Sequence, residues 1–235
     1  MSAPVIEIAG LTVNAGEIVA LVGESGSGKS TLGRIALGLL APDSGSVEFD
    51  GHRLTGLAPE VFRDLRTGMQ PIFQDPTASL NPRKTVRQLL MQALWKRPDE
   101  GEARCVRLLE DVGLRPAAQY LDRFPHELSG GQRQRVSIAR SLAMEPKLII
   151  ADEPLSGADV SIRGQELNLL LDIQRSRGVA YLMITHDISI ARAFADRVAV
   201  MMKGEVVESG PAEEVLRNPT HEYTKRLVAA VPALG

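Results

Sequence analysis

A glycine-rich loop that ends in a lysine and a serine is the part of the sequence best suited to chemistry. Residues 23–30 read Gly-Glu-Ser-Gly-Ser-Gly-Lys-Ser, which matches the phosphate-binding pattern G-x-x-x-x-G-K-[ST]. Gly26 and Gly28 would let the backbone wrap around phosphate oxygens, so that successive N–H groups face negative charge. We expect Lys29 to reach the β- and γ-phosphates and the Ser30 hydroxyl to bind Mg²⁺. The residues expected to hold the phosphates are Gly23, Glu24, Ser25, Gly26, Ser27, Gly28, Lys29, Ser30 and Thr31.

Two carboxylates follow an apolar segment in the second half of the chain. Residues 148–151 read Leu-Ile-Ile-Ala, and Asp152 and Glu153 come directly after them. A parallel α/β sheet places its ligand chemistry at the carboxyl ends of its strands. We expect Asp152 to hold Mg²⁺, through a water molecule, and Glu153 to polarise the attacking water. The alternative is a helix-capping turn before Pro154, but carboxylates that follow a buried strand are costly to place without a task.

Two further side chains are candidates on position alone. His186 follows the apolar segment 179–185, so in a parallel sheet it would emerge at the same edge as Asp152 and could touch the γ-phosphate. A structural role for this histidine is an equally good interpretation. Gln74 ends the segment Pro71-Ile72-Phe73-Gln74. Residue type and position alone give Gln74 no function.

Hydrophobic periodicity predicts the elements that would position these side chains. Short apolar segments predict strands at 17–22, 147–151 and 179–185, an edge strand at 46–49 and a hairpin at 198–208. Helical spacing is found at 31–40, 86–96, 102–112, 133–142 and 162–177, and twice within 211–230. The phosphate loop therefore lies between a strand and a helix, which favours phosphate binding over a chance glycine-rich turn.

Composition excludes several classes of function. The 235 residues include 27 basic and 29 acidic side chains, for a net charge of -2, which does not favour nucleic acid as a partner. Cys105 is the single cysteine, so an internal disulfide and thiolate zinc sites are excluded. No apolar run approaches the roughly 20 residues needed to cross a bilayer, and residues 1–10 do not have the layout of a signal peptide.

The sequence Leu-Ser-Gly-Gly-Gln at 128–132 stands between the phosphate loop and the acidic segment. With it, the ordered set of motifs resembles the ABC transporter ATPases, over nearly the whole chain. The resemblance implies an α/β P-loop NTPase fold with a RecA-like core, a small antiparallel β element and an inserted helical subdomain. We expect residues 1–235 to form one ABC ATPase domain, with the nucleotide-binding core at 1–74 and 147–235 and the helical subdomain at 75–146.

The resemblance also implies roles and partners. The cofactors are ATP and Mg²⁺, and hydrolysis is coupled to transport across a membrane. In this family two subunits close on ATP, so the turn formed by Ser129, Gly130, Gly131 and Gln132 would seal the γ-phosphate held by a second ATP-binding subunit. Gln74 would sense Mg²⁺ and water and touch the permease, and His186 would be the switch histidine. Asp159 would lie at the dimer interface. These roles imply a peripheral protein at the cytoplasmic face of the inner membrane.

Two departures from the family pattern stand out. Residues 156–159 read Ser-Gly-Ala-Asp where relatives commonly have Ser-Ala-Leu-Asp, which predicts a more flexible segment. Relatives also stack adenine on an aromatic residue before the phosphate loop, yet no Phe, Tyr or Trp occurs in residues 1–22, and 5–13 resembles the family's opening strand. Base stacking is typically worth about 1 to 3 kcal/mol in nucleic-acid settings. We therefore expect weak, base-tolerant nucleotide binding.

Two segments resemble the subfamily that imports peptides, nickel and opines, acting indirectly with a solute-binding protein. They are 72–83 with its Gln-Asp-Pro and Leu-Asn-Pro-Arg sequences, and His221-Glu222-Tyr223-Thr224-Lys225 followed by Ala-Val-Pro at 230–232. The alternative is that both segments only pack the structure. Two rival functions remain: a soluble ABC ATPase acting on nucleic acid or the ribosome, and a catalytically weak cassette in a heterodimer.

Overall fold

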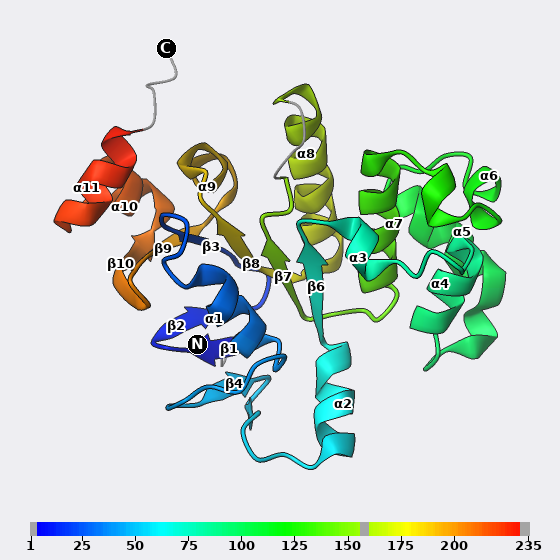
Figure 1. The fold of residues 1–235 in the computed structure, drawn as a ribbon, viewed down its shortest axis with the longest axis horizontal. Coiled ribbons are helices and arrows are strands. Elements are labelled where there is room, and N and C mark those ends of the chain that lie inside the picture. Colours follow the sequence, from blue (N-terminus) through cyan, green and yellow to red (C-terminus); the bar gives the residue numbers. More distant parts are fainter. Residues whose placement is uncertain (1–3, 156–159, 231–235) are drawn as a thin grey trace.

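A mixed six-stranded sheet forms the centre of the protein (Figure 1). The computed structural model describes residues 4–155 and 160–230, and its sheet has the strand order β10-β9-β3-β8-β7-β6. The strand β10 (Glu205–Pro211) is antiparallel to β9, and the other neighbours are parallel. The parallel strands are β3 (Ile18–Val22), β6 (Met69–Phe73), β7 (Leu148–Asp152), β8 (Ala180–Thr185) and β9 (Arg197–Met202).

The sheet is buried on both faces because its side chains alternate between two hydrophobic clusters. In β7, Leu148 and Ile150 join the cluster that contains the helix α1 (Lys29–Ala36), whereas Ile149 and Ala151 join the cluster that contains the helical region. The strand β8 divides its side chains between the same two clusters. This packing fixes the register of the central strands and therefore the position of every residue at their ends.

A second sheet of four strands packs beside α1, in the order β2-β1-β4-β5. Its strands are β1 (Ile6–Ile8), β2 (Leu11–Val13), β4 (Val47–Phe49) and β5 (His52–Arg53), and the neighbours are antiparallel. The segment 5–13 forms two strands, because Ala9 and Gly10 turn the chain with φ of 52° and 75°. The expectation of an edge strand at 46–49 is wrong, since β4 lies between β1 and β5.

Helices fill the segment between β6 and β7 and lie together to one side of the sheet (Figure 1). They are α3 (Pro76–Ser79), α4 (Val86–Ala93), α5 (Gly101–Asp111), α6 (Ala118–Leu121) and α7 (Gly130–Leu142). The side chain of Thr85 caps α4 by accepting a hydrogen bond from the N–H of Gln88. The core of this region is continuous with one face of the sheet through residues such as Ile149 and Tyr181.

The remaining helices are α2 (Pro59–Thr67), α8 (Val160–Arg177), α9 (Ile188–Phe194), α10 (Ala212–Arg217) and α11 (Glu222–Ala229). The helices α9, α10 and α11 pack against β3 and β9 in a third cluster. The helix expected at 31–40 begins at Lys29 and ends at Ala36, before Gly38 with its φ of 62°. Among the described residues, no helix is long and apolar enough to span a membrane.

Candidate functional site

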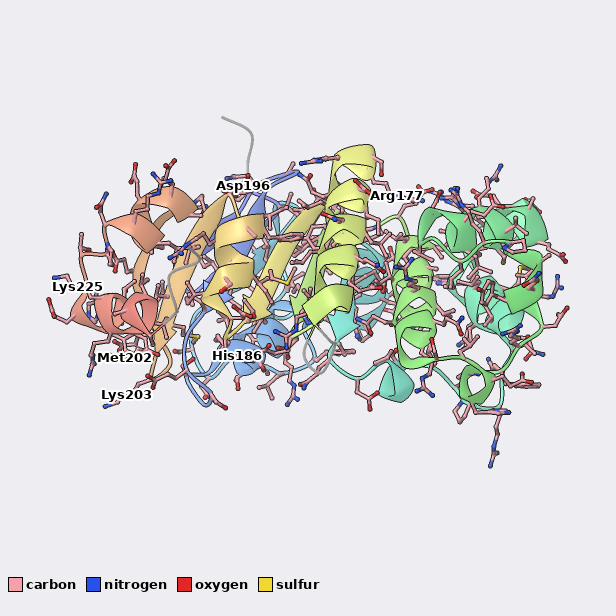
Figure 2. All side chains as sticks on the ribbon, turned by 90° about the horizontal axis from the view of Figure 1, so that it is seen from above. Arg177, His186, Asp196, Met202, Lys203 and Lys225 are labelled. Atoms are coloured by element: carbon pink, nitrogen blue, oxygen red, sulfur yellow. The ribbon has the colours of Figure 1, made fainter. Side chains whose placement is uncertain are left out.

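The carboxyl ends of four neighbouring strands bring the predicted site residues to one edge of the sheet. The strands β3, β8, β7 and β6 lie side by side, and Gly23, His186, Glu153 and Gln74 come at or just after their ends. In Figure 2, His186 and Lys203 lie at this edge, whereas Arg177 and Asp196 lie at the opposite one. Residues from four separate segments thus surround a cavity of about 400 Å³. They are Ser25, Gly26, Gly28, Lys29, Ser30, Thr31, Gln74, Glu153 and His186.

Lys29 is folded back onto the loop that precedes it. Its Nζ donates hydrogen bonds to the carbonyl oxygens of Gly23 at 2.7 Å and Glu24 at 2.8 Å. Burial lowers the pKa of Lys29, and the negative charges of Glu153 and Asp152 oppose that effect. The ammonium is therefore held at the N-terminus of the helix α1, where the N–H groups of the helix also attract anions.

Ser30 and Asp152 connect the first turn of α1 to the end of β7. The Oγ of Ser30 donates a hydrogen bond to Oδ1 of Asp152 over 3.0 Å. Burial raises the pKa of Asp152, and the bond from Ser30 works in the other direction. Hydroxyl and carboxylate oxygens are the donors that Mg²⁺ prefers. No group of three or more His, Cys, Asp or Glu residues suited to a metal occurs in residues 4–155 and 160–230, so phosphate and water oxygens would have to complete such a site.

Glu153 is held by His186. One carboxylate oxygen, Oε1, accepts the main-chain N–H of His186 at 3.0 Å and lies 2.7 Å from Nδ1 of the same residue. The Glu153 backbone has a φ of 49°, an uncommon conformation for a residue with a side chain, and its N–H donates to the carbonyl of Ile184. Such local strain is typical of residues whose side chain must be aimed into a site.

The turn at 128–132 lies apart from this cavity, on the helical region at the start of α7 (Figure 1). Ser129 caps α7: its Oγ accepts the N–H of Gln132 at 3.2 Å, and Oε1 of Gln132 accepts the N–H of Ser129 at 3.0 Å. Gly130 and Gly131 are exposed and belong to the first turn of the helix, which we expected to begin at Arg133. Asp159 lies outside the described residues.

The order of these motifs and their fold agree with a comparison against protein families. Residues 6–156 match the family described as ABC transporter. The chain belongs to the ABC transporter family. The expected α/β fold of an ABC ATPase is therefore confirmed.

Two relatives of this ABC domain illustrate the similarity. The glutathione import ATP-binding protein GsiA of Salmonella paratyphi A is 52% identical over 221 residues, which are 92% of this chain and 35% of that protein. GsiA of Escherichia coli (strain K12) is 51% identical over the same length. The chain thus spans about a third of the length of the curated relatives that it matches.

Two solved structures share the fold. The structure of cbiO1 from Clostridium perfringens, part of the ABC transporter complex cbiONQ, has a TM-score of 0.79 and 33% identity, and covers 88% of this chain and 82% of its own. The dimeric, post-hydrolysis structure of the ATP-binding cassette MJ0796, bound to ADP and Pi, has a TM-score of 0.75 and 31% identity, and covers 86% and 88%.

The structure adds one neighbour of the phosphate loop that the sequence did not reveal. The N–H of Glu24 donates a hydrogen bond to Oη of Tyr223, which lies 199 positions further along the ABC chain. The segment 221–225 resembles a transporter subfamily, but no local pattern predicts a hydrogen bond over this separation.

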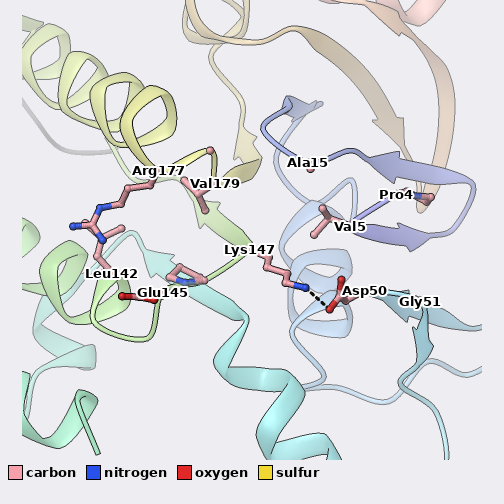
Figure 3. A pocket seen from close by; sticks show the side chains of 12 residues that line it. Pro4, Val5, Ala15, Asp50, Gly51, Leu142, Glu145, Lys147, Arg177 and Val179 are labelled. Carbon is pink, nitrogen blue, oxygen red and sulfur yellow. Dashed lines mark hydrogen bonds and ion pairs between the residues drawn. The ribbon is translucent and has the colours of Figure 1, made fainter. Parts of the chain in front are cut away.

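A larger cavity of about 730 Å³ lies at the opposite edge of the sheet, beside the beginnings of β7 and β8 (Figure 3). Its charged side chains are already paired: Lys147 with Asp50 at 2.5 Å, Arg177 with Asp111, and Glu145 with Arg104. The parallel strands begin at this edge, so it lacks the loops that collect ligand chemistry in α/β proteins.

Proposed function

We propose that this chain is the ATP-hydrolysing subunit of an ABC importer that carries peptides, nickel or similar small solutes. The observation that supports it best is the convergence on one cavity of a lysine at a helix start, a serine bound to an acid, and a second acid bound to a histidine. These groups supply what phosphoryl transfer needs, namely positioning and charge stabilisation. The similarity to the import proteins named GsiA supports the choice of an importer.

The phosphate loop is proposed to bind the triphosphate of ATP. Its backbone N–H groups and the start of α1 would face the phosphate oxygens, and Lys29 would exchange its carbonyl partners for the β- and γ-phosphates. Ser30, Asp152 and Gln74 would hold Mg²⁺, which supplies charge neutralisation at the phosphates. The 3.0 Å contact between Ser30 and Asp152 supports this assignment, because two hard oxygen donors already converge there.

Glu153 is proposed to orient and polarise the attacking water. Its Oε1 is in hydrogen-bond contact with His186. This contact fixes the carboxylate and leaves Oε2 to accept a proton from water. His186 would contact the γ-phosphate, and Gln74 would report the state of the site to a membrane partner. The presence of both Glu153 and His186 in one hydrogen-bonded pair argues against a catalytically weak cassette.

The second half of each site is proposed to come from a partner. Ser129, Gly130, Gly131 and Gln132 form the start of α7. The N–H groups of Ser129 and Gln132 are used in the capping box, so the exposed Gly130 and Gly131 would offer their N–H groups to an anion. Because this turn does not line the cavity of its own chain, we propose that it closes on ATP bound by a second ATP-binding subunit, with Asp159 at the interface. The dimeric form of MJ0796 supports this arrangement.

Residues 75–146 are proposed to form a helical subdomain of the single domain. A groove of about 590 Å³ lies where these helices meet α2 and β6, and it includes Phe73, Phe62, Met144 and the half-exposed Trp95. We propose that this groove receives the permease subunits, since it lies beside the segment that carries Gln74. The chain would then work at the cytoplasmic face of the membrane, with a solute-binding protein as an indirect partner.

The decisive experiment compares Glu153→Gln with Glu213→Gln, an exposed acid on α10. Glu153→Gln is expected to keep nucleotide affinity but to lower ATP turnover by at least about 100-fold. It should also accumulate as an ATP-bound dimer in light scattering after size exclusion. Glu213→Gln should behave as the wild type. Ordinary turnover by Glu153→Gln, or turnover proportional to the concentration of a strictly monomeric protein, would contradict the proposal.

A further inference from the structure

The C-terminal helix α11 reaches the phosphate loop through one side chain. Tyr223 lies at the start of α11, is 5% exposed, and belongs to the cluster that packs α9, α10 and α11 against β3 and β9. Its Oη accepts the N–H of Glu24 at 2.9 Å. The hydroxyl therefore meets the second residue of the loop from the side of the C-terminal helices.

The same peptide group is held on its other side by the phosphate-binding lysine. The carbonyl of Gly23 and the N–H of Glu24 belong to one planar peptide unit. Its oxygen accepts from Nζ of Lys29 at 2.7 Å, and its N–H donates to Tyr223. A rotation of this peptide would break both hydrogen bonds at once, so Tyr223 and Lys29 together fix its orientation.

The position of Tyr223 is itself determined by a carboxylate on β10. Glu208 accepts hydrogen bonds from the N–H and Oγ1 of Thr220, each at 2.8 Å, and from the N–H of His221 at 3.1 Å. His221 in turn caps α11, because its Nδ1 accepts the N–H of Tyr223 at 3.1 Å. The hydroxyl that meets the loop is thus placed by a continuous series of hydrogen bonds that begins in the sheet.

The strand next to β10 supports the loop as well. The turn between β9 and β10 donates a hydrogen bond from the N–H of Gly204 to the carbonyl of Ser27 at 2.9 Å. A Cβ on Gly23 would lie only 2.2 Å from the carbonyl oxygen of Met201. Gly23 and Ser27 of the phosphate loop therefore pack against the β9–β10 hairpin, and Glu24 contacts α11.

We propose that Tyr223 is a positioning residue for nucleotide binding, which fixes the Gly23–Glu24 peptide so that the phosphate loop is shaped before a phosphate arrives. The inference rests on the proposed function of the loop. A loop that is already ordered loses less conformational freedom on binding, so its affinity is higher. Since the loop surrounds the phosphates shared by ADP and ATP, both nucleotides should depend on Tyr223 to the same extent. The catalytic pair Glu153 and His186 should not depend on it.

The test is Tyr223→Phe, which keeps the buried ring and removes only the hydroxyl. Tyr181→Phe is the matched control, because Tyr181 on β8 is fully buried and its hydroxyl has no hydrogen-bond partner among the described residues. Dissociation constants for Mg-ADP would be measured by calorimetry, and KM and kcat for ATP by steady-state hydrolysis. Hydrogen exchange of residues 20–28 in nucleotide-free protein gives a direct view of the loop.

For Tyr223→Phe we expect about a 3- to 10-fold rise in the Mg-ADP dissociation constant and in KM, which is the usual net effect of one hydrogen bond. The kcat should stay within about 2-fold of the wild type, and the loop should exchange faster. Tyr181→Phe should change none of these values. Unchanged Mg-ADP affinity in Tyr223→Phe, or a fall in kcat alone, would overturn the inference. A wild-type chain that binds no Mg-ADP would instead contradict the proposed function itself.

Discussion

A single carboxylate oxygen of Glu153 contacts two nitrogen atoms of His186: Oε1 lies 3.0 Å from the main-chain nitrogen and 2.7 Å from Nδ1. The two residues follow neighbouring strands, β7 and β8, so the sheet itself holds them at this distance. The histidine side chain is 63% exposed, whereas that of the glutamate is 19% exposed. The imidazole therefore faces the cavity opening and is available to a ligand.

His186→Ala should lower kcat while leaving nucleotide affinity nearly unchanged. The main-chain N–H would still hold Glu153, but the contact of the imidazole with the carboxylate and the γ-phosphate would be lost. We expect a loss of at least about 100-fold in kcat, the range for a positioned acid or base, with the Mg-ADP dissociation constant within about 2-fold. His52→Ala, on the exposed strand β5, is the control. Full turnover by His186→Ala would exclude the assigned role.

Nucleotide binding should tolerate different bases. Residues 1–22 contain no Phe, Tyr or Trp. Tyr223, whose hydroxyl meets the loop, is buried, and Cζ of Arg226 lies 6.0 Å from its ring centroid. That ring therefore offers no open face on which adenine could stack. Competition binding should give ATP and GTP dissociation constants within about tenfold of each other, because residues 1–22 supply no aromatic ring for a stacking contribution of about 1 to 3 kcal/mol. A larger preference would refute this expectation.

The hydrogen bonds by which Glu208 holds the start of α11 should contribute less to stability in acid. Partial burial by itself would raise the pKa of Glu208, but hydrogen bonds from Thr220 and His221 outweigh it and lower the pKa from 4.5 to about 2. A depressed carboxyl pKa stabilises the folded state above the unfolded value, and this contribution is lost as the pH falls from 4.5 toward 2. Glu208→Gln should therefore reduce the free energy of unfolding at pH 7 by about 1 to 2 kcal/mol.

Urea unfolding of wild type and Glu208→Gln between pH 7 and pH 2 measures this effect. The difference between the two proteins should shrink as the pH falls through 4.5 and nearly vanish near pH 2. Glu214→Gln, an exposed acid on α10, serves as the matched control and should not reproduce the pattern. A difference that stays constant over the whole range would show that the carboxylate charge is irrelevant.

Two glycines should respond in opposite directions to alanine. A Cβ at Gly23 would lie 2.2 Å from the carbonyl oxygen of Met201, a backbone atom that cannot move without disturbing β9. We expect Gly23→Ala to destabilise the protein by at least about 2 kcal/mol. Gly164 lies within α8, where a Cβ meets nothing within 4 Å, so Gly164→Ala should stabilise by up to about 1 kcal/mol. Thermal unfolding of both variants checks the signs.

The sequence predicted the strand and helix on either side of residues 23–30 and the strand that leads to Asp152, because these elements depend on local patterns. The apolar strand before Gly23 and the one before Asp152 bury both faces, which their unbroken hydrophobic composition indicates. The helical spacing predicts a start at Arg133 for α7, which begins at Gly130, because glycine is a poor helix former. The capping-box pattern from Ser129 to Gln132 was the signal that could have corrected it.

Other features were not accessible from local patterns. The turn at Ala9 and Gly10 requires a left-handed conformation at an alanine, which sequence rules do not anticipate. The strand β6 contains Pro71, which discourages a strand assignment, yet it fits because β6 lies at the edge of the sheet. The contact of Tyr223 with Glu24 depends on the packing of the whole C-terminal region.

The alternation of β7 side chains between two hydrophobic clusters has a consequence for how the acids can change during evolution. Inserting one residue into this strand would send Leu148 and Ile150 into the space shaped for Ile149 and Ala151, and the reverse. The phase of the strand is thus enforced along its whole length by packing. Asp152 and Glu153 can therefore be replaced by other side chains through single substitutions. An insertion or deletion that moved them to other positions in the strand would disrupt both hydrophobic clusters.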